Sequence, residues 1–285
     1  MKSKWMTIVL ILVMVAGLSL LLYPSFASYW NTNHATRTIA TYSEDISVLK
    51  EDQITEIWQN AVEYNKNFRG GGGAGGTLTE EQLAAYNALL NIGDTGMMGF
   101  IDIDCLNVSL PIYHGTSEGV LQVAAGHLDW TSLPVGGEGT HCVISGHRGL
   151  PSAKLFSDLD KLHEGQTFTL TVLDTVLTYE IDQIRIVEPE NISDLVIVPG
   201  KDYCTLLTCT PYGVNTHRLL VRGHRITTPE NSLGARLTSE AMQIEPLIVA
   251  SLMAVPPLLV LLILVFSRKK KSPTFSEVRN REEVD

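Results

Sequence analysis

The chain has 285 residues, of which 31 are acidic and 21 basic, so its formal net charge at pH 7 is −10. Nucleic-acid binding depends on basic surfaces that neutralise phosphates, and an acidic chain of this kind argues against nucleic acid as a partner. Hydrophobic residues make up 45% of the sequence. Their distribution separates two apolar ends from a mixed central region.

The N-terminal end is an apolar stretch. Residues 6–22 carry no charge, and two lysines lie just before them. The uncharged stretch continues to Trp30, which makes it long enough to span a hydrocarbon core about 30 Å thick. A cleaved signal peptide is the alternative, because small residues ending at Ala27 suit a signal peptidase. We therefore expect residues 1–30 to be a membrane anchor or a signal segment.

The C-terminal end contains a second uncharged stretch, residues 246–267, followed by the basic run RKKK. Two consecutive prolines within it would kink a helix, which membrane helices tolerate more readily than soluble ones. Basic clusters flank the outer ends of both stretches, so the positive-inside rule places both termini in the cytoplasm and residues 28–245 outside. The sequence thus predicts a linker at 231–245, a transmembrane helix at 246–267 and a cytoplasmic tail at 268–285.

Residues 31–96 are predicted to form a helical preface. Between residues 40 and 68, apolar side chains recur at helical spacing among Glu, Gln and Lys, which indicates one or two amphipathic helices. The run RGGGGAGG at 69–76 breaks any helix and predicts a mobile loop. Beyond it, Thr79 lies three residues ahead of Gln82, a capping-box spacing that predicts a further short helix.

The sequence becomes strand-like from about residue 97. Runs rich in Val, Ile, Thr, Tyr and Phe follow one another, with alternation at Phe168, Leu170 and Val172, and Gly, Pro and Asp turns separate them. Several such runs suit a closed or nearly closed antiparallel β-barrel. We therefore predict a mainly β domain at 97–230, with short helices.

Four cysteines, at positions 105, 142, 204 and 209, lie in the region expected outside the membrane. An oxidising compartment favours pairing, but none of them shows a CxxC or metal-like spacing. Cys204 and Cys209 are five residues apart, and on one strand an odd offset points them to opposite faces. They would not bridge each other, whereas a disulfide between Cys105 and Cys142 stays open.

Two stretches end in residues suited to nucleophilic catalysis. The run YCTLLTC closes at Cys209, a Pro-Tyr-Gly turn follows, and the returning run carries Arg218, so a hairpin would bring the arginine back beside the cysteine. The stretch CVISGHRGL places His147 where a strand opens into a Gly-rich loop, and such loops often display catalytic side chains. A cysteine nucleophile needs a proton donor and a stabilised oxyanion. The alternative is a buried strand cysteine, a surface arginine and a turn histidine.

Three segments carry a resemblance to a known family: residues 110–137, 143–162 and 206–225. They resemble the sortases, membrane-anchored cysteine transpeptidases of Gram-positive bacteria, and in particular the class C branch that assembles pili. The family signature TLxTC, followed by an arginine on the next strand, stands here as TLLTC ending at Cys209 and then Arg218. The resemblance covers nearly the whole predicted barrel and implies a sortase-type barrel fold.

The resemblance implies that Cys209 is the nucleophile, His147 the general acid and base, and Arg218 the residue that holds the substrate carbonyl and its oxyanion. His127 matches a family position usually regarded as structural. The implied reaction cleaves an LPXTG-like sorting signal between Thr and Gly and joins the acyl group to a lysine of a pilin subunit. Such acyl transfer between amides needs neither a metal nor another cofactor, so we expect none.

Two other functions are kept as alternatives. A housekeeping-type sortase would attach surface proteins to a cell-wall precursor amine, and a non-catalytic scaffold would only gather pilus subunits. One departure from class C is clear. A lid with an Asp-Pro-aromatic tripeptide is common there, but this chain has Phe68 and the glycine run at 69–76 instead, with no Asp-Pro pair. We expect an open groove with a loose loop, or else a glycine loop that replaces the lid.

Overall fold

The structure is a computed structural model that describes residues 2–68 and 78–228. Its α-helices are α1 (Lys2–Ser47), α2 (Glu51–Asn67), α3 (Glu80–Ala88) and α4 (Glu118–Leu121), and its short 3₁₀ helices are η1 (Ile92–Asp94), η2 (Asp104–Leu106), η3 (Leu159–Lys161) and η4 (Ser193–Leu195). The strands are β1 (Met97–Ile103), β2 (Val108–His114), β3 (Ala125–His127), β4 (Thr140–Ser145), β5 (Thr167–Val172), β6 (Thr175–Val187), β7 (Asp202–Thr210) and β8 (His217–Ile226).

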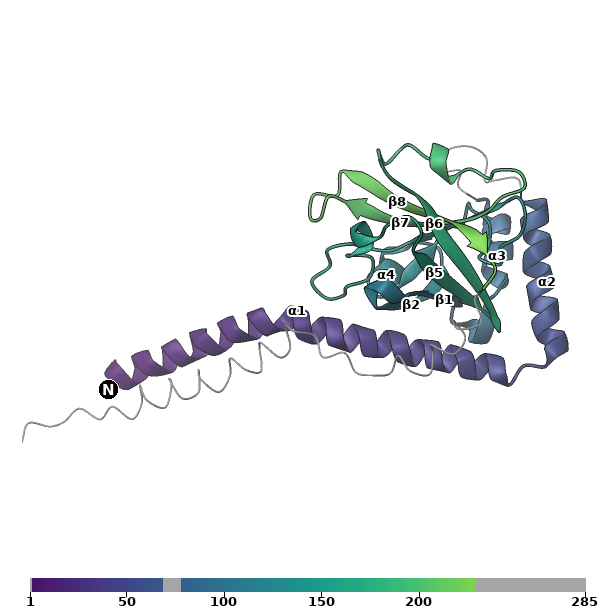
Figure 1. The fold of residues 1–285 in the computed structure, drawn as a ribbon. Coiled ribbons are helices and arrows are strands. Elements are labelled where there is room, and N and C mark those ends of the chain that lie inside the picture. Colours follow the sequence, from purple (N-terminus) through teal and green to yellow (C-terminus); the bar gives the residue numbers. More distant parts are fainter. Residues whose placement is uncertain (1, 69–77, 229–285) are drawn as a thin grey trace, which may run out of the picture. The chain divides into compact units, whose positions relative to one another are not determined.

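The strands form a closed barrel in the order β1-β2-β3-β4-β7-β8-β6-β5 (Figure 1). Closure of the predicted barrel is confirmed, since β5 pairs with β1. The barrel is not wholly antiparallel, however, because β2 pairs with β3, and β4 with β7, in parallel. Each parallel pair is joined through a longer connection rather than a tight hairpin. The parallel pairing of β4 with β7 places their carboxyl ends at the same end of the barrel.

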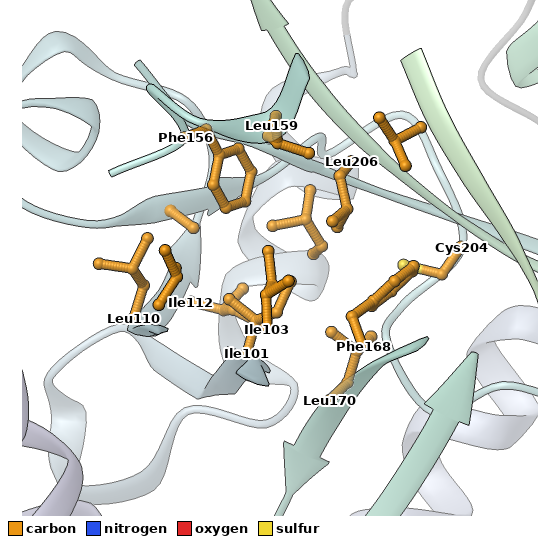
Figure 2. Close-up of a cluster of buried hydrophobic side chains, with 14 of the residues drawn as sticks. Ile101, Ile103, Leu110, Ile112, Phe156, Leu159, Phe168, Leu170, Cys204 and Leu206 are labelled. Atoms are coloured by element: carbon orange, nitrogen blue, oxygen red, sulfur yellow. The ribbon is translucent and has the colours of Figure 1, made fainter. Parts of the chain in front are cut away.

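Apolar side chains fill the barrel interior (Figure 2). The alternation in β5 directs Phe168 and Leu170 into this cluster, where they are 1% and 0% exposed. The connection between β4 and β5 adds Phe156 and Leu159. Burial of large side chains such as these contributes about 1.5–3 kcal/mol each. The core thus also includes the connection that begins just after β4.

Helix α1 begins in the apolar N-terminal stretch and continues without interruption past residue 30 to Ser47, with Pro24 inside it. The segment Ile11–Ser47 is long and apolar enough, by length and composition, to cross a membrane. Near its end, the hydroxyl of Tyr42 donates to Met98 O at 2.9 Å and accepts from Leu173 N at 3.0 Å. The end of this helix is therefore fastened to the barrel.

Residues 40–68, predicted to form one or two helices, contain the end of α1 and the whole of α2, and the further short helix predicted after the glycine run is α3. Helix α2 follows the end of α1, and its Asn65 holds the backbone of Leu133 by two hydrogen bonds of 3.0 and 2.8 Å. The predicted capping box at the start of α3 is also confirmed, because Thr79 and Gln82 exchange side chain to backbone hydrogen bonds. The glycine run at 69–76 lies outside the described residues, as do the predicted segments from residue 231 onward.

The four cysteines are free. Cys105 is exposed in η2 while Cys142 points into the core from β4, so the disulfide considered between them is not formed. Cys204 is fully buried and Cys209 only partly so, which agrees with the opposite faces predicted from their odd offset. Cys204 lies beside Cys142 across the β4–β7 pairing.

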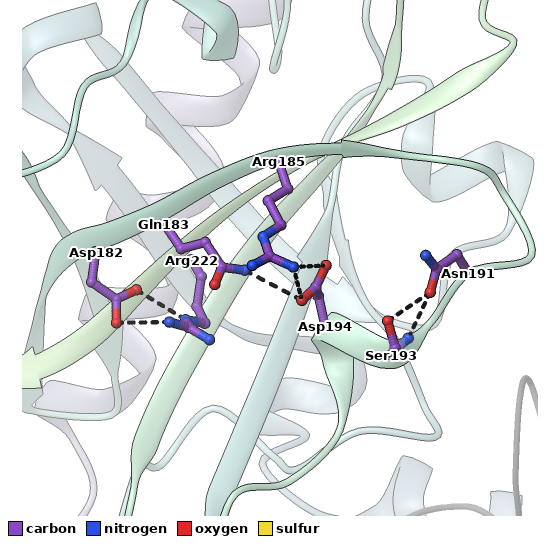
Figure 3. A network of polar contacts seen from close by, with 7 residues as sticks. All are labelled: Asp182, Gln183, Arg185, Asn191, Ser193, Asp194 and Arg222. Atoms are coloured by element: carbon purple, nitrogen blue, oxygen red, sulfur yellow. Dashed lines mark hydrogen bonds and ion pairs between the residues drawn. The ribbon is translucent and has the colours of Figure 1, made fainter.

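Two arginine–aspartate ion pairs connect strand β6 with β8 and with η4 (Figure 3). Arg222 on β8 donates two hydrogen bonds, of 2.9 and 3.0 Å, to Asp182 on β6, and its guanidinium lies 4.2 Å from the ring centroid of Tyr203. Arg185 on β6 pairs at 3.0 Å with Asp194 in η4. The second pair fastens the long connection between β6 and β7 to the barrel wall.

Candidate active site

Cys209 lies next to the last residue of β7, where it pairs directly with Arg218 of β8. The pairing of Thr210 with His217 closes this hairpin, and residues 211–216 form its turn. Antiparallel partners on one face stand about 4.5–5.5 Å apart at Cβ. The predicted return of the arginine to the side of the cysteine is therefore confirmed.

His147 reaches the same end of the barrel from β4. The β4–β7 register ends with Ser145 opposite Leu207, and the next residue, Gly146, continues it. The amide of Gly146 donates to Leu207 O at 3.1 Å, and the Thr208 hydroxyl donates to Gly146 O at 2.7 Å. β4 ends at Ser145, and continuing its register by two residues along each parallel segment aligns His147 with Cys209.

Gly146 has a steric role in this approach. A Cβ atom at this position would lie 2.6 Å from the ring of Phe156, which is 1% exposed and fixed in the core. A contact this short requires something to move. Glycine therefore allows the backbone before His147 to lie against the packed core.

The side chain of His147 faces a carboxylate that the sequence did not reveal. Its Nε2 atom lies 3.6 Å from Oε2 of Glu118 in α4, with exposed fractions of 27% for the histidine and 72% for the glutamate. The Gln122 side chain donates to the other carboxylate oxygen at 2.7 Å. This hydrogen bond and the nearby histidine lower the pKa of Glu118 below its ordinary value. Only the fold brings these segments together, so no local signal marked Glu118.

Arg218 is directed toward the turn that joins its strand to Cys209. Its Nη1 atom contacts the carbonyl oxygens of Asn215 at 3.4 Å and His217 at 3.2 Å. A guanidinium has five N–H donors, and within the described part of the chain these are its only hydrogen bonds. The group therefore retains donors with which it can bind a carbonyl oxygen or an oxyanion.

The histidines in the barrel interior have structural contacts. His127 is fully buried, with Nδ1 2.9 Å from the Tyr86 hydroxyl and Nε2 2.8 Å from Ser132 O, consistent with the structural role that the resemblance implied. His141 bonds Thr205 and Val196. Burial lowers the pKa of His141, which keeps its ring neutral. His141 pairs with Tyr203, six residues before Cys209 on β7, so its ring belongs to the other half of that strand.

A cavity of about 470 Å³ lies at the other end of β7, where Asp202 and Arg225 are among its lining residues. Since Asp202 begins β7 and Cys209 is close to its end, this cavity is separated from the proposed site by nearly the whole strand. The candidate site is thus a partly exposed set of side chains at strand ends, not the cavity itself.

Comparison with known proteins agrees with this arrangement. A family model described as Sortase domain matches residues 101–226, which span β1 to β8 and include all three candidate residues. Because the match begins within the first strand and ends with the last, it coincides with the barrel.

Three solved structures show the relationship at greater length. Sortase C1 from Streptococcus agalactiae is 51% identical, with a TM-score of 0.65 over 68% of this chain and 100% of that chain. Sortase C from Streptococcus pneumoniae is 43% identical, with a TM-score of 0.62 over 67% and 97%. Sortase C from Clostridium perfringens is 44% identical, with a TM-score of 0.59 over 68% and 100%. With a closed barrel and these relatives, the chain belongs to the sortase family of cysteine transpeptidases, and its structural neighbours are class C sortases.

Proposed function

We propose that the chain polymerises pilins by acyl transfer through Cys209, with His147 as the general acid and base and Arg218 as the carbonyl-binding residue. The observation that carries these roles is the convergence of two strand pairings at one end of the barrel. One pairing sets Arg218 opposite Cys209, and the other brings the segment before His147 alongside β7.

In the first half of the reaction, the Cys209 thiolate attacks the Thr–Gly carbonyl of an LPXTG-like sorting signal. The carbonyl oxygen gains negative charge, and the guanidinium of Arg218 stabilises it with donors that are already in place. When the tetrahedral intermediate collapses, the C–N bond breaks and His147 gives a proton to the leaving glycine amine. The product is a thioester on Cys209.

In the second half, a lysine amine from another pilin attacks the thioester. His147, now neutral, takes the proton that the amine loses, and the C–S bond breaks to release the Cys209 thiolate. An isopeptide bond joins the two pilins. One amide is broken and another is formed, so the chemistry requires no nucleotide.

The class C neighbours support pilin as the substrate. The Streptococcus pneumoniae sortase C is described in terms of pilin substrate specificity, and the Clostridium perfringens enzyme was solved with a C-terminal cell wall sorting motif. The chain is similar to both over about two thirds of its length. We extend pilin and sorting-motif recognition to this chain as part of the proposal.

We also propose that the barrel acts on the outer side of the cell membrane. The apolar part of α1 supports an N-terminal anchor. The second span proposed at 246–267 and the cytoplasmic position of both termini rest on the sequence alone. A membrane-held enzyme would meet pilins whose own sorting signals lie near the membrane.

The test uses the full-length chain in detergent with a pilin domain that carries an LPXTG-type signal. We expect linked pilins, with an isopeptide bond to lysine located by mass spectrometry of the digested product. A pilin in which the acceptor lysine is replaced by arginine serves as the control. Transfer only to a cell-wall-type amine, with no dependence on a pilin lysine, would contradict pilin polymerisation and favour the housekeeping reaction.

A further inference from the structure

Arg148, the residue after His147, reaches back to the segment that follows Cys209. Its Nη1 atom donates to the Thr210 hydroxyl at 3.3 Å, and its guanidinium lies 6.0 Å from the ring centroid of Tyr212. Its Nη2 atom pairs with Asp160 at 2.6 Å. One side chain therefore connects the loop that carries His147 with the turn that begins at the end of β7.

Gly149, the next residue, also lies close to the ring of Tyr212. Gly149 has φ of +80°, and a Cβ there would lie 3.3 Å from the ring of Tyr212. Its amide donates to the Ser157 hydroxyl at 3.1 Å, which holds the turn against its own loop. Arg148 and Gly149 thus pack against the same tyrosine. We call this contact, formed by Arg148, Gly149, Asp160, Thr210 and Tyr212, the arginine latch.

The energetics of Arg148 favour a geometric role over a stabilising one. Its side chain is only 7% exposed, while Asp160 is 47% exposed. Within residues 2–68 and 78–228, its Nε atom is buried and has no hydrogen-bond partner. Burying a cation is costly unless it is fully paired, and unpaired buried polar atoms are uncommon in folded proteins. Since Asp160 can remain solvated without its partner, the loss of Arg148 leaves no isolated buried charge.

The position of the latch explains what it can do for the reaction. The hydrogen bonds of Gly146 fix β4 against β7 just before His147 and Cys209. After those residues, the first segment continues into the connection toward β5, and β7 ends at Thr210. The hydrogen bond from Arg148 to the Thr210 hydroxyl joins the residue directly after His147 to the residue directly after Cys209, while the ion pair with Asp160 holds the same guanidinium from its other side.

We propose that Arg148 is a positioning residue that fixes the distance between His147 and Cys209, an inference that rests on the catalytic roles proposed above. The hydrogen bonds of Gly146 hold the two chain segments together just before His147 and Cys209, and the arginine latch holds them together just after these residues. Rigid placement of reacting groups accounts for a large part of enzymatic rate, and a displacement of about 1 Å can lower the rate by about 100-fold. Loss of the latch lowers the rate of acyl transfer more than it lowers peptide binding or stability.

The test compares Arg148→Met and Arg148→Lys with Arg222→Met in the full-length enzyme in detergent. Arg222 is a matched control because its guanidinium also forms an ion pair with an aspartate and lies over a tyrosine ring. It lies farther from the proposed site, however, because its partner across the β7–β8 ladder is Thr205, four residues before Cys209. Three quantities are measured: kcat and KM for an LPXTG-type peptide, the thermal midpoint, and the alkylation rate of Cys209 against pH, located by peptide mapping.

We expect Arg148→Met to lower kcat by about 10- to 100-fold with KM changed less than about threefold. Its alkylation profile should be displaced from that of the wild type, because His147 is no longer held beside the thiol. Arg148→Lys should recover part of kcat, and Arg222→Met should keep the wild-type kcat and profile. A wild-type kcat and alkylation profile in Arg148→Met would overturn the inference. So would an equal loss of kcat in Arg222→Met.

The alkylation profile needs no substrate, so it separates the two proposals. If the wild-type enzyme fails to cleave the peptide but its profile differs from that of Arg148→Met, the proposed substrate is contradicted while the positioning role is supported. If cleavage is normal in the wild type and unchanged in Arg148→Met, the positioning role alone is contradicted.

Discussion

Arg218 and Glu118 both lie beside proposed catalytic residues, but they differ in what they can contribute. Arg218 is opposite Cys209 across a β-ladder, so its position is fixed by backbone pairing. Glu118 comes from a four-residue helix and is 72% exposed. A permanent charge held by a strand can stabilise a developing oxyanion, whereas an exposed pair is weakened by solvent.

Replacing Arg218 by lysine should lower kcat for peptide cleavage by about 100- to 1000-fold, because a point charge on a flexible stem cannot reproduce the planar set of donors. The thermal midpoint should stay close to that of the wild type, because the hydrogen bonds of Arg218 to described residues go to the carbonyls of Asn215 and His217, both close to it in the sequence. Steady-state kinetics and a thermal scan measure both. A lysine variant with full kcat would show that the oxyanion is stabilised elsewhere.

Replacing Glu118 by glutamine should change kcat/KM by less than about threefold, since solvent screens an exposed ion pair and leaves it a small contribution. The amide preserves the shape of the side chain while removing its charge. The measurement is kcat/KM at low and at physiological salt. A loss of 10-fold or more at physiological salt would show that Glu118 takes part in the reaction.

Local patterns made Cys209, Arg218 and His147 candidates, because each marks the point where a strand meets a turn. They left open a buried cysteine, a surface arginine and a turn histidine, and the family resemblance supplied the three roles. Local patterns could not reveal Arg148 or Glu118. The hydrogen bond from Arg148 to Thr210 spans 62 positions in the sequence, and the Glu118 contact joins two connections of the barrel. Such contacts follow from strand pairing and not from neighbouring residues.

At the scale of elements, the helical preface is held to the barrel by a few specific contacts. Asn65 is 6% exposed and forms two hydrogen bonds with the backbone of Leu133. Tyr86 of α3 is fully buried, and its hydroxyl meets His127. Helix α3 therefore contacts β3, and α2 contacts the connection from β3 to β4.

Replacing Asn65 by alanine should lower the free energy of unfolding by about 2–4 kcal/mol, because a buried donor and a buried acceptor of Leu133 lose their partner. Chemical denaturation measures this change. Asn67→Ala is the matched control, since Asn67 is exposed on the same helix and, among the described residues, its side chain hydrogen-bonds Glu63, four residues before it. Equal destabilisation by both substitutions would show that the Leu133 contacts contribute nothing specific.

Alternation in the sequence was enough to predict a barrel, because apolar residues such as Phe168 and Leu170 recur on one face of a strand. The parallel pairing of β4 with β7 could not be predicted in this way. A strand with both faces covered shows no alternation, and all six residues of β4 are buried. Its partner is therefore set by the topology of the whole barrel.

At the scale of the whole molecule, His141 links three parts of the barrel. Its Nδ1 atom lies 2.9 Å from Val196 O, and its Nε2 atom lies 2.7 Å from the Thr205 hydroxyl. Because a carbonyl can only accept, Nδ1 carries the proton and Nε2 accepts from the hydroxyl. Protonation of the ring would remove that acceptor from a buried site.

We expect the free energy of unfolding to fall as the pH is lowered from 7.5 to 5.5. Burial lowers the pKa of His141 in the folded state below its ordinary value of 6.5, so the unfolded chain binds more protons as the pH falls through that value. The stabilising contribution is therefore present above about pH 6.5 and lost below it. Urea denaturation at both pH values measures the difference.

His141→Gln should reduce this pH dependence, whereas His163→Gln should leave it unchanged because His163 is exposed. The comparison removes the effects of carboxyl groups, which are common to both variants. A wild-type pH dependence in His141→Gln would show that other groups cause the loss of stability.

The most direct test of the proposed chemistry is the intact mass of the full-length enzyme after incubation with an LPXTG-type peptide and no amine acceptor. We expect a mass increase equal to the peptide fragment up to threonine, mapped to Cys209, released by hydroxylamine and absent from Cys209→Ala. The folded fraction of that variant, checked by thermal denaturation, should match the wild type. Peptide cleavage that continues in folded Cys209→Ala, or an adduct mapped to another residue, would contradict the proposed chemistry.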